Sequence, residues 1–235
     1  MARRSYDQYC GLAHALDVVG ERWTLLIVRE LMSGPKRYSD LEAALSGIGT
    51  SLLAARVKQL QSDGLVGRRL LDPPVNAVAY ELTTTGRELG RALAPLALWG
   101  ARYFLSEQGA AAEQFRAEWA LVFVADSLEP DALRNLAVDY EFHIDDSVAR
   151  MHISDGRAEI TTGSSEIPAT AVLRSDAVTV GAIAGGRLTV TDAVMQGRIR
   201  PEGDPEALQT LLTLLNTQVN SLVAQVGGPE HSGTA

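Results

Sequence analysis

Cysteine is almost absent from this chain of 235 residues, in which Cys10 is the only one. A single cysteine excludes an internal disulfide framework and any zinc site built from several cysteines. No apolar run reaches the roughly 18 residues that indicate a membrane span. The first residues lead into no apolar segment of the signal-peptide kind. These absences predict a cytoplasmic protein with no membrane partner.

Familiar catalytic motifs are missing as well: there is no Gly-x-Ser-x-Gly, no phosphate-binding Gly-Lys-Ser/Thr loop and no His-Glu-x-x-His. The four histidines are scattered along the chain, at His14, His143, His152 and His231. His143 and His152 could meet across adjacent strands, but two histidines without carboxylate support make a weak metal site. Asp145-Asp146 is more typical of a turn than of a catalytic pair. We therefore expect no enzyme, no cofactor and no metal.

Basic residues are fewer than acidic residues, and the net charge is −8. They are also unevenly distributed along the chain. Residues 1–108 carry 13 basic and 11 acidic residues, a net +2, whereas residues 109–235 carry 8 and 18, a net −10. Both lysines, Lys36 and Lys58, lie in the first part. This asymmetry indicates two modules, and only the first could accept nucleic acid.

The first half is predicted to begin with helices. Leu12, Leu16 and Val19 recur at helical spacing, and a second run extends from Trp23 to Leu31. Ser39-Asp40-Leu41-Glu42 fits a capping box at the start of a short helix that reaches about Leu45. After a turn at 46–49, a helix is expected from Thr50 to Asp63.

The helix at Thr50–Asp63 has two contrasting faces. Leu53, Val57 and Leu60 share one face. The opposite face is small and polar, with a single cation, and consists of Thr50, Ser51, Ala54, Ala55 and Lys58. A face of this kind lets a helix sit deep in a groove.

A two-stranded hairpin is expected next, with strands at 65–70 and 77–82 joined by 72–76. The order of elements is that of a winged helix-turn-helix. A long helix follows, in which Pro95 should bend or disturb one turn. Its apolar stripe should bury itself on a partner subunit, and it consists of Leu89, Leu93, Leu96, Gly100 and Tyr103.

The second half is predicted to be an α+β unit, a sheet covered by helices. A linker at 109–114 precedes this domain, which spans 115–227, and a disordered tail follows at 228–235. Strands are expected at 119–124, 140–144, 148–154, 157–161, 169–173 and 197–201, with helices at 176–184, 191–195 and 205–226. In the third strand, Ala149, Met151 and Ile153 should face the core, while Arg150, His152 and Ser154 should face water.

The first 105 or so residues resemble the HxlR family, a branch of the MarR-like winged-helix regulators. The similarity is carried by Cys10, by 15–31 (ALDVVGERWTLLIVREL), by 34–41 (GPKRYSDL), by Asp63-Gly64-Leu65-Val66, by Tyr80-Glu81-Leu82-Thr83 and by Leu96 to Trp99-Gly100. The family usually has Gly-Gly-Lys-Trp where this chain has Gly20-Glu21-Arg22-Trp23, and Ser where Gly49 stands. The resemblance implies a homodimeric regulator of a palindromic operator.

The segment 188–204 (LTVTDAVMQGRIRPEGD) is similar to the closing motif of sterol carrier protein type-2-like domains, and 176–186 resembles the segment before it. Such domains enclose an apolar tunnel. The resemblance implies a sensor for an apolar small molecule, with candidate lining residues Trp119, Phe123, Phe142, Met151, Ile183, Met195 and Leu211.

The leading interpretation is a dimeric DNA-binding transcriptional regulator. Its recognition helix would use the outer face of Thr50–Asp63, and its phosphate contacts would come from Lys36, Arg37, Arg68 and Arg69. Cys10 stands where several HxlR-like proteins have a redox-sensing cysteine, although a small buried apolar thiol is the alternative. The rival hypothesis is a lipid-binding or protein-interaction module whose winged helix does not bind DNA.

Overall fold

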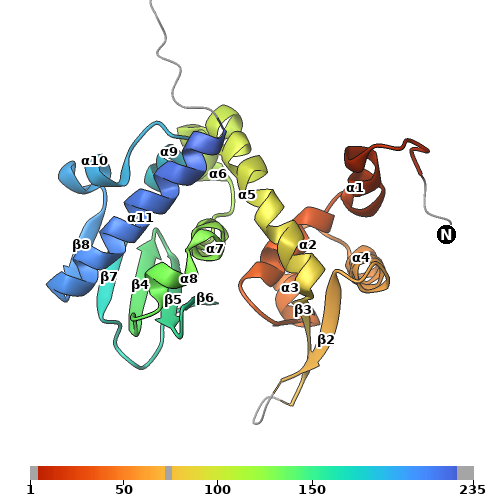
Figure 1. Ribbon diagram of the computed structural model, residues 1–235, viewed down its shortest axis with the longest axis horizontal. Coiled ribbons are helices and arrows are strands. Elements are labelled where there is room, and N and C mark those ends of the chain that lie inside the picture. Colours follow the sequence, from red (N-terminus) through yellow and green to blue (C-terminus); the bar gives the residue numbers. More distant parts are fainter. Residues whose placement is uncertain (1–4, 72–75, 227–235) are drawn as a thin grey trace, which may run out of the picture. The chain divides into compact units, whose positions relative to one another are not determined.

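The computed structural model describes residues 5–71 and 76–226. The chain divides into two compact units, Met1–Gly90 and Arg91–Ala235 (Figure 1). Within the described residues, no helix has both the length and the apolar character that crossing a bilayer requires. The division falls inside one long helix, α5 (Thr84–Phe104), so its first turns belong to the first unit and the remainder to the second.

Four helices open the first unit: α1 (Gly11–Val19), α2 (Thr24–Met32), α3 (Tyr38–Ala44) and α4 (Thr50–Ser62). The helix predicted from Thr50 to Asp63 is confirmed, and its Leu53, Val57 and Leu60 are all buried. The turn between α3 and α4 depends on Gly47, whose φ of 95° lies in the left-handed region that glycine favours.

A small sheet forms the wing. Strands β2 (Val66–Leu70) and β3 (Val78–Leu82) make the predicted hairpin, and its connecting residues 72–75 lie outside the described residues. A third strand, β1 (Lys36–Arg37), was not predicted and pairs antiparallel with β3, which gives the order β1-β3-β2. Two charged residues carry no strand pattern, so only the pairing reveals β1.

The predicted capping box at the start of α3 is wrong. The helix begins one residue earlier than Ser39, and Asp40 accepts a hydrogen bond from the backbone N–H of Arg37 at 3.0 Å. Glu42 instead accepts a hydrogen bond from the Thr50 hydroxyl at 2.8 Å. The free backbone N–H at the start of α3 is therefore still satisfied by a carboxylate at the third helical position, but this carboxylate is Asp40 and not Glu42.

The second unit is the predicted helix-covered sheet. Its helices after α5 are α6 (Glu107–Ala112), α7 (Ala117–Ser127), α8 (Pro130–Leu133), α9 (Ala177–Ala184), α10 (Val190–Met195) and α11 (Pro205–Gln225). Its strands are β4 (Val138–Ile144), β5 (Ser147–Ser154), β6 (Arg157–Thr162), β7 (Ala171–Ser175) and β8 (Arg200–Gly203), in the order β6-β5-β4-β7-β8. Only β4 and β7 run parallel.

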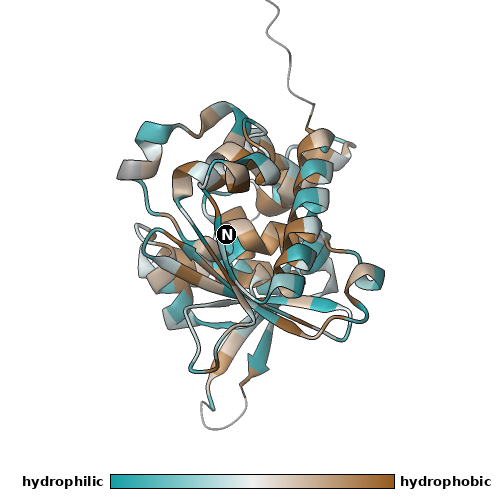
Figure 2. Cartoon of the chain, turned by 90° about the vertical axis from the view of Figure 1, so that its left-hand side faces the viewer, coloured by the Kyte–Doolittle hydropathy of each residue, from teal (hydrophilic) through white to brown (hydrophobic). Residues whose placement is uncertain are grey.

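One face of this sheet forms the core. Tyr140 pairs with Met151, and Phe142 pairs with Ala149, so all four side chains share a face. They are buried, and the Tyr140 hydroxyl donates to the backbone oxygen of Ala207 in α11. Brown and teal residues alternate along these strands and helices in Figure 2, as expected of elements that bury one side.

Three predictions in this half are wrong or displaced. The apolar run Trp119–Val124 is not a strand but the middle of α7. The expected linker at 109–114 is helical as far as Ala112, within α6. The last strand begins at Arg200, three residues later than expected. The expected tail at 228–235 lies outside the described residues.

The face of the sheet opposite the core also departs from prediction. Arg150 is only 5% exposed, not wet, because its guanidinium donates to the backbone oxygen of Ile167 at 2.8 Å. His143 and His152 do not meet, since the register pairs them with Val148 and Asp139. Each histidine instead contacts a carboxylate, His143 with Glu141 at 2.6 Å and His152 with Asp139 at 3.1 Å.

Candidate nucleic-acid interface

The outward face of α4 is small and largely uncharged. Ser51, Ala54, Ala55 and Lys58 are exposed, as the helical periodicity predicts. Thr50 is exposed too, but its hydroxyl is directed to Glu42 and not outward. Four of the five predicted groove residues therefore present their side chains to solvent, and the fifth presents a hydroxyl that is already bound.

The N-terminus of α4 leaves backbone donors available. Its N-cap, Gly49, has no side chain that could accept from the first N–H groups. The Tyr38 hydroxyl donates to the backbone oxygen of Thr50 at 2.7 Å and so fixes the start of the helix against α3. Burial, followed by the nearby Glu42 and Tyr80, raises the pKa of Tyr38, so this phenol stays protonated. Uncapped N–H groups at a helix start bind anions readily.

The four cations predicted to contact phosphates form two rows on the wing sheet. Tyr80 pairs with Lys36 of β1 on one side and with Arg68 of β2 on the other. The next position, Ala79, pairs with Arg37 and Arg69. Successive residues of a strand point to opposite faces. Two rows therefore lie on opposite faces of the sheet: the Tyr80 row, which is Lys36, Tyr80 and Arg68, and the Ala79 row, which is Arg37, Ala79 and Arg69. The sequence alone places all four cations in one set of phosphate contacts.

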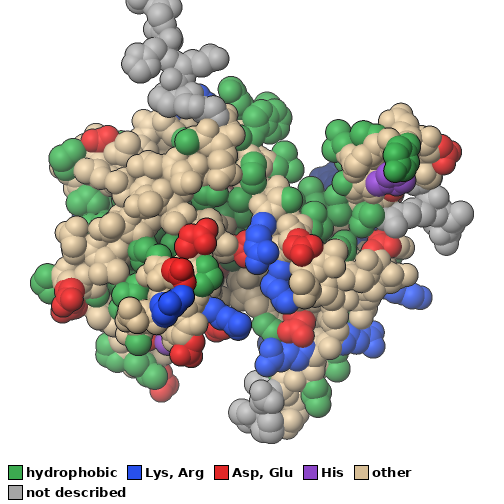
Figure 3. All heavy atoms as spheres, in the orientation of Figure 1, with side chains coloured by type: hydrophobic (Ala, Val, Ile, Leu, Met, Phe, Trp, Pro, Cys, Tyr) green, Lys and Arg blue, Asp and Glu red, His purple; other side chains and the backbone are tan. Residues whose placement is uncertain are grey.

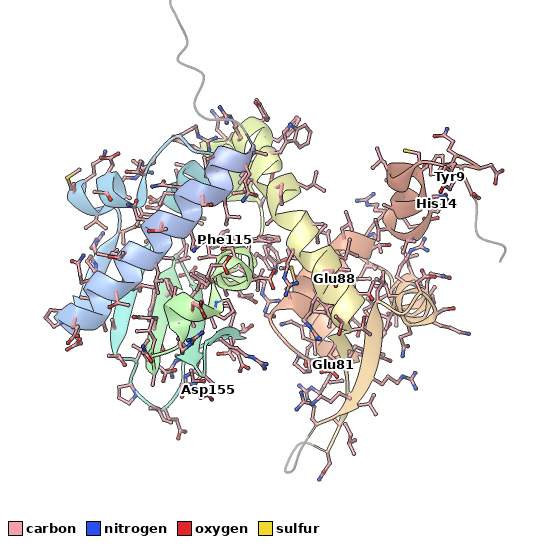
Figure 4. The ribbon with its side chains drawn as sticks, viewed as in Figure 1. Tyr9, His14, Glu81, Glu88, Phe115 and Asp155 are labelled. Atoms are coloured by element: carbon pink, nitrogen blue, oxygen red, sulfur yellow. The ribbon has the colours of Figure 1, made fainter. Side chains whose placement is uncertain are left out.

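Carboxylates neutralise the Ala79 row. Arg37 pairs with Asp40 at 2.9 Å, and the hydrogen bonds and charge of Arg37 lower the pKa of Asp40. Arg69 lies 3.6 Å from Glu81, which Figure 4 labels on β3. Ala79 itself is fully buried, whereas the Arg37 and Arg69 side chains on either side of it are about half exposed.

The Tyr80 row keeps its positive charge. The Arg68 guanidinium lies 5.8 Å from the centroid of the Tyr80 ring, within cation–π distance. Lys36, Arg68 and Lys58 form no ion pair within residues 5–71 and 76–226. Lys36 of this row lies two residues before Tyr38, and the Tyr38 hydroxyl is bonded to Thr50 at the N-terminus of α4, so this end of the row lies near the start of α4. Figure 3 shows several Lys and Arg side chains on the wing side of this unit.

Sequence reasoning missed the residues that hold this surface in place. Besides Tyr38, Arg56 of α4 pairs with Glu21 at 2.7 Å, which joins α4 to the turn before α2. That turn also contains Trp23 in the left-handed region, with φ of 78°. Glu21 was visible in the sequence only as a departure from the HxlR pattern, and nothing in the spacing indicated its partner.

The seven predicted ligand-lining residues differ in where they lie and how far they are buried. Phe142, Met151, Ile183 and Leu211 are buried in the core of the second unit, and Trp119 and Phe123 are half-buried on α7. Met195 is 72% exposed at the end of α10, so it lines no enclosed space. Among the seven, Phe123 lines the pocket described below.

Cys10 is exposed at the N-cap of α1, and is not a buried apolar thiol. The backbone N–H groups of Ala13 and Leu12 lower the pKa of its thiol. The neighbouring Tyr9 and His14 are labelled in Figure 4. Among the described residues, no group of three metal-ligating side chains occurs.

The helices α1–α4, with the α3–α4 pair and the wing, define a winged helix-turn-helix protein with an appended α+β unit. The model of the HxlR-like helix-turn-helix family matches residues 18–108. The chain belongs to this family. The model of the SCP-2 sterol transfer family matches residues 120–216, so the second resemblance is confirmed as well.

Relatives of the first half carry the same kind of description. The chain is 33% identical over 89 residues to the HTH-type transcriptional regulator YvaP of Bacillus subtilis, which covers 38% of this chain and 82% of that protein. It is 35% identical over 80 residues to the HTH-type transcriptional regulator sll1512 of Synechocystis, covering 34% and 59%. It is 38% identical over 98 residues to the HTH-type transcriptional regulator Rv3095 of Mycobacterium tuberculosis, covering 42% and 61%.

Proposed function

We propose that this protein is a transcriptional regulator that binds duplex DNA through α4 and the wing. The observation that carries the proposal is the combination of a small outward face on α4 with an unpaired cationic row beside its N-terminus. The small face permits close approach to base edges in the major groove. Lys36 and Arg68 of the Tyr80 row, with the uncapped N–H groups of α4, would bind phosphate oxygens. The relatives named as regulators support the same conclusion.

We propose that the protein acts as a homodimer. The second half of α5 exposes a row of large apolar side chains at helical spacing, with Leu96 51%, Trp99 45% and Tyr103 59% exposed. Trp99 and Phe104 stack edge to face with their centroids 5.1 Å apart. Leu93 of the predicted stripe is buried and not available to a partner. A contiguous exposed apolar patch marks an interaction site, and two copies would place their α4 helices about 34 Å apart, one turn of DNA.

The experiment is fluorescence anisotropy of the full chain with labelled duplexes from the region upstream of its own gene, at two salt concentrations. We expect one fragment to bind far more tightly than an unrelated duplex of equal length, and the affinity to fall as salt rises, because counterions are released from neutralised phosphates. Equal, weak binding to every fragment at low salt would overturn the proposal.

Dimerisation is tested on the same protein by light scattering. Leu96→Glu and Tyr103→Glu place charges on the exposed row and should shift the mass to that of one chain. Glu88→Gln, an exposed change on the same helix outside the row, is the matched control. A native chain that is a monomer at every concentration would overturn the dimer.

The match of residues 120–216 to the SCP-2 sterol transfer family model covers most of the second unit. This match favours a role for the second unit in sensing a small molecule. We propose that a ligand there changes DNA affinity, which requires unequal binding to the DNA-competent and DNA-incompetent states. The rival function, a module whose winged helix does not bind DNA, is favoured by the net charge of −8. The anisotropy experiment separates the two.

A further inference from the structure

The second unit contains a pocket of about 400 Å³ that the family resemblances do not assign. That volume lies in the range of small-molecule sites. Four helices labelled in Figure 1 contribute its walls: the middle of α5, the end of α7, the start of α8 and the end of α11. The lining residues are Arg91, Ala94, Pro95, Phe123, Asp126, Ser127, Leu128, Glu129, Pro130, Leu222 and Gln225.

Part of the wall suits an apolar body. Phe123 of α7, Leu222 of α11 and Ala94 of α5 come from three different helices, and Leu128 and Pro130 extend the same apolar lining. Phe123 is half-buried, so its ring is partly open to a ligand. A short hydrocarbon chain or a single ring would gain by leaving water here.

The charged groups of the lining leave a net negative charge. Arg91 and Asp126 face each other, with Nε 3.6 Å from Oδ2, and largely cancel. The remaining charge is the carboxylate of Glu129, which is exposed and forms no ion pair within the described part of the chain. A carboxylate at the rim of a pocket lined by both polar and apolar groups attracts a cation and repels an anion.

The backbone adds to the negative potential. The C-terminal ends of α7 and α11 both lie at the pocket, because Ser127 and Gln225 line it. A helix C-terminus carries a partial negative charge. Pro95 has no N–H, so the carbonyl of Arg91 cannot receive the usual hydrogen bond from residue 95 and remains an acceptor.

We propose that this pocket binds a small amphipathic cation, an ammonium or amidinium group on a short apolar body. The body would lie against Phe123 and Leu222, and the cation near Glu129. A fatty acid has the opposite head group and would be disfavoured, although the match to a sterol transfer family points to lipids in general. That this ligand is the effector rests on the proposed function.

The pocket is placed to act on α5. Its residues Arg91, Ala94 and Pro95 occupy the turn where the helical hydrogen bonding is incomplete. Farther along, Arg187 donates to the backbone oxygens of Ala101 and Arg102 at 3.2 and 3.3 Å, which fastens the last turn of α5 to the loop after α9. The last turn of α5 is fixed, so a ligand that changes the conformation at Pro95 would change the path of the helix between these two points. The exposed apolar residues from Leu96 to Tyr103, which we propose as the dimer surface, lie in that part of α5.

The test uses three probes with the same eight-carbon chain: octyltrimethylammonium, octanol and octanoate. Calorimetry on the full chain at low salt, where charges are least screened, should show the cation binding at least about tenfold more tightly than octanoate, with octanol between them. Glu129→Gln should remove the difference between cation and octanoate. Glu166→Gln removes an exposed carboxylate outside the pocket and should leave the difference unchanged.

Octanoate binding as tightly as the cation, or a preference that survives Glu129→Gln, would overturn the pocket assignment, as would the absence of binding by all three probes. These measurements contain no DNA, so they stand apart from the proposed function. DNA affinity measured without probe tests that function, and DNA affinity measured with octyltrimethylammonium tests the coupling. Probe binding that leaves DNA affinity unchanged would retain the pocket and overturn its role as the effector site.

Discussion

Glu21 and Arg56 form an ion pair of 2.7 Å that connects the turn before α2 with the middle of helix α4. Glu21 is largely exposed, whereas Arg56 is mostly covered. The pair therefore holds a half-buried cation at a fixed place on α4.

Replacing Glu21 with Gln leaves that cation without its counter-charge. We expect a loss of below about 1 kcal/mol in the free energy of unfolding, because exposed pairs contribute little. Urea unfolding of E21Q, R56A and the double variant measures the coupling. Additive losses in the double variant would show that the pair contributes nothing.

The two wing rows predict unequal roles for neighbouring arginines. Arg68→Ala removes an unpaired cation and should weaken DNA binding about tenfold at low salt and reduce the salt dependence by about one phosphate contact. Arg69→Ala removes a cation already paired with Glu81 and should have a smaller effect. Lys58→Ala should behave as Arg68→Ala does. Anisotropy titrations at several salt concentrations compare them, and equal losses at Arg68 and Arg69 would contradict the division into rows.

Two glycines of α5 should respond in opposite ways to alanine. A Cβ at Gly86 would lie 2.1 Å from the backbone oxygen of Leu65, so G86A must displace the backbone just before β2 and should cost more than about 1 kcal/mol. Gly100 has open space around it within the chain, and G100A should stabilise the helix by up to about 1 kcal/mol. Thermal unfolding measures both. A neutral G86A would refute the close approach.

Asp40 predicts a stability difference that depends on pH. Arg37 lowers the pKa of Asp40 in the folded chain, so the ionised carboxylate stabilises the fold above its unfolded pKa of about 3.9. That contribution disappears as the pH falls through the lowered folded value. D40N keeps an acceptor for the Arg37 N–H, and should be less stable at neutral pH by under about 1 kcal/mol, since the pair is partly exposed. The gap should close below about pH 4 in urea titrations, and a gap independent of pH would exclude the ion pair as its cause.

Cys10 should alkylate faster near neutral pH than a free thiol. The N–H groups at the start of α1 lower its pKa, so a larger fraction is thiolate. The pH profile of the iodoacetamide rate, followed by the mass of the intact chain, should have a midpoint below that of N-acetylcysteine measured alongside. Since Cys10 is the only cysteine, every adduct reports on it. A midpoint equal to that of the reference thiol would contradict the backbone effect.

The elements that sequence reasoning placed well have a clear period. The buried side of α4 follows a spacing of 3.6 residues, and the β2–β3 hairpin is marked by two short strand-like segments separated by turn residues. The run Trp119–Val124 has no such period, since six apolar residues fit a buried strand or the middle of a helix equally well. In the structure the run lies within a helix of 11 residues, which extends from Ala117 to Ser127.

The candidate site was less predictable than the fold. Lys36 and Arg37 are adjacent, as are Arg68 and Arg69, so strand alternation divides each pair between two faces. Which members of the two pairs share a face depends on the register with β3, which the sequence does not reveal. Arg150 alternates correctly along β5 but is covered by a loop carrying Ile167. In both places a contact distant in sequence decides whether a charge is available.

The long helix α5 has a consequence for how this protein can be taken apart. Leu93, Ala94 and Ala101 are buried although they lie N-terminal to the segment that matches the sterol transfer family. A fragment ending at residue 108 would expose these apolar side chains to solvent. We expect it to aggregate or to bind another apolar surface. We therefore expect a fragment containing either half alone to be less soluble than the full chain.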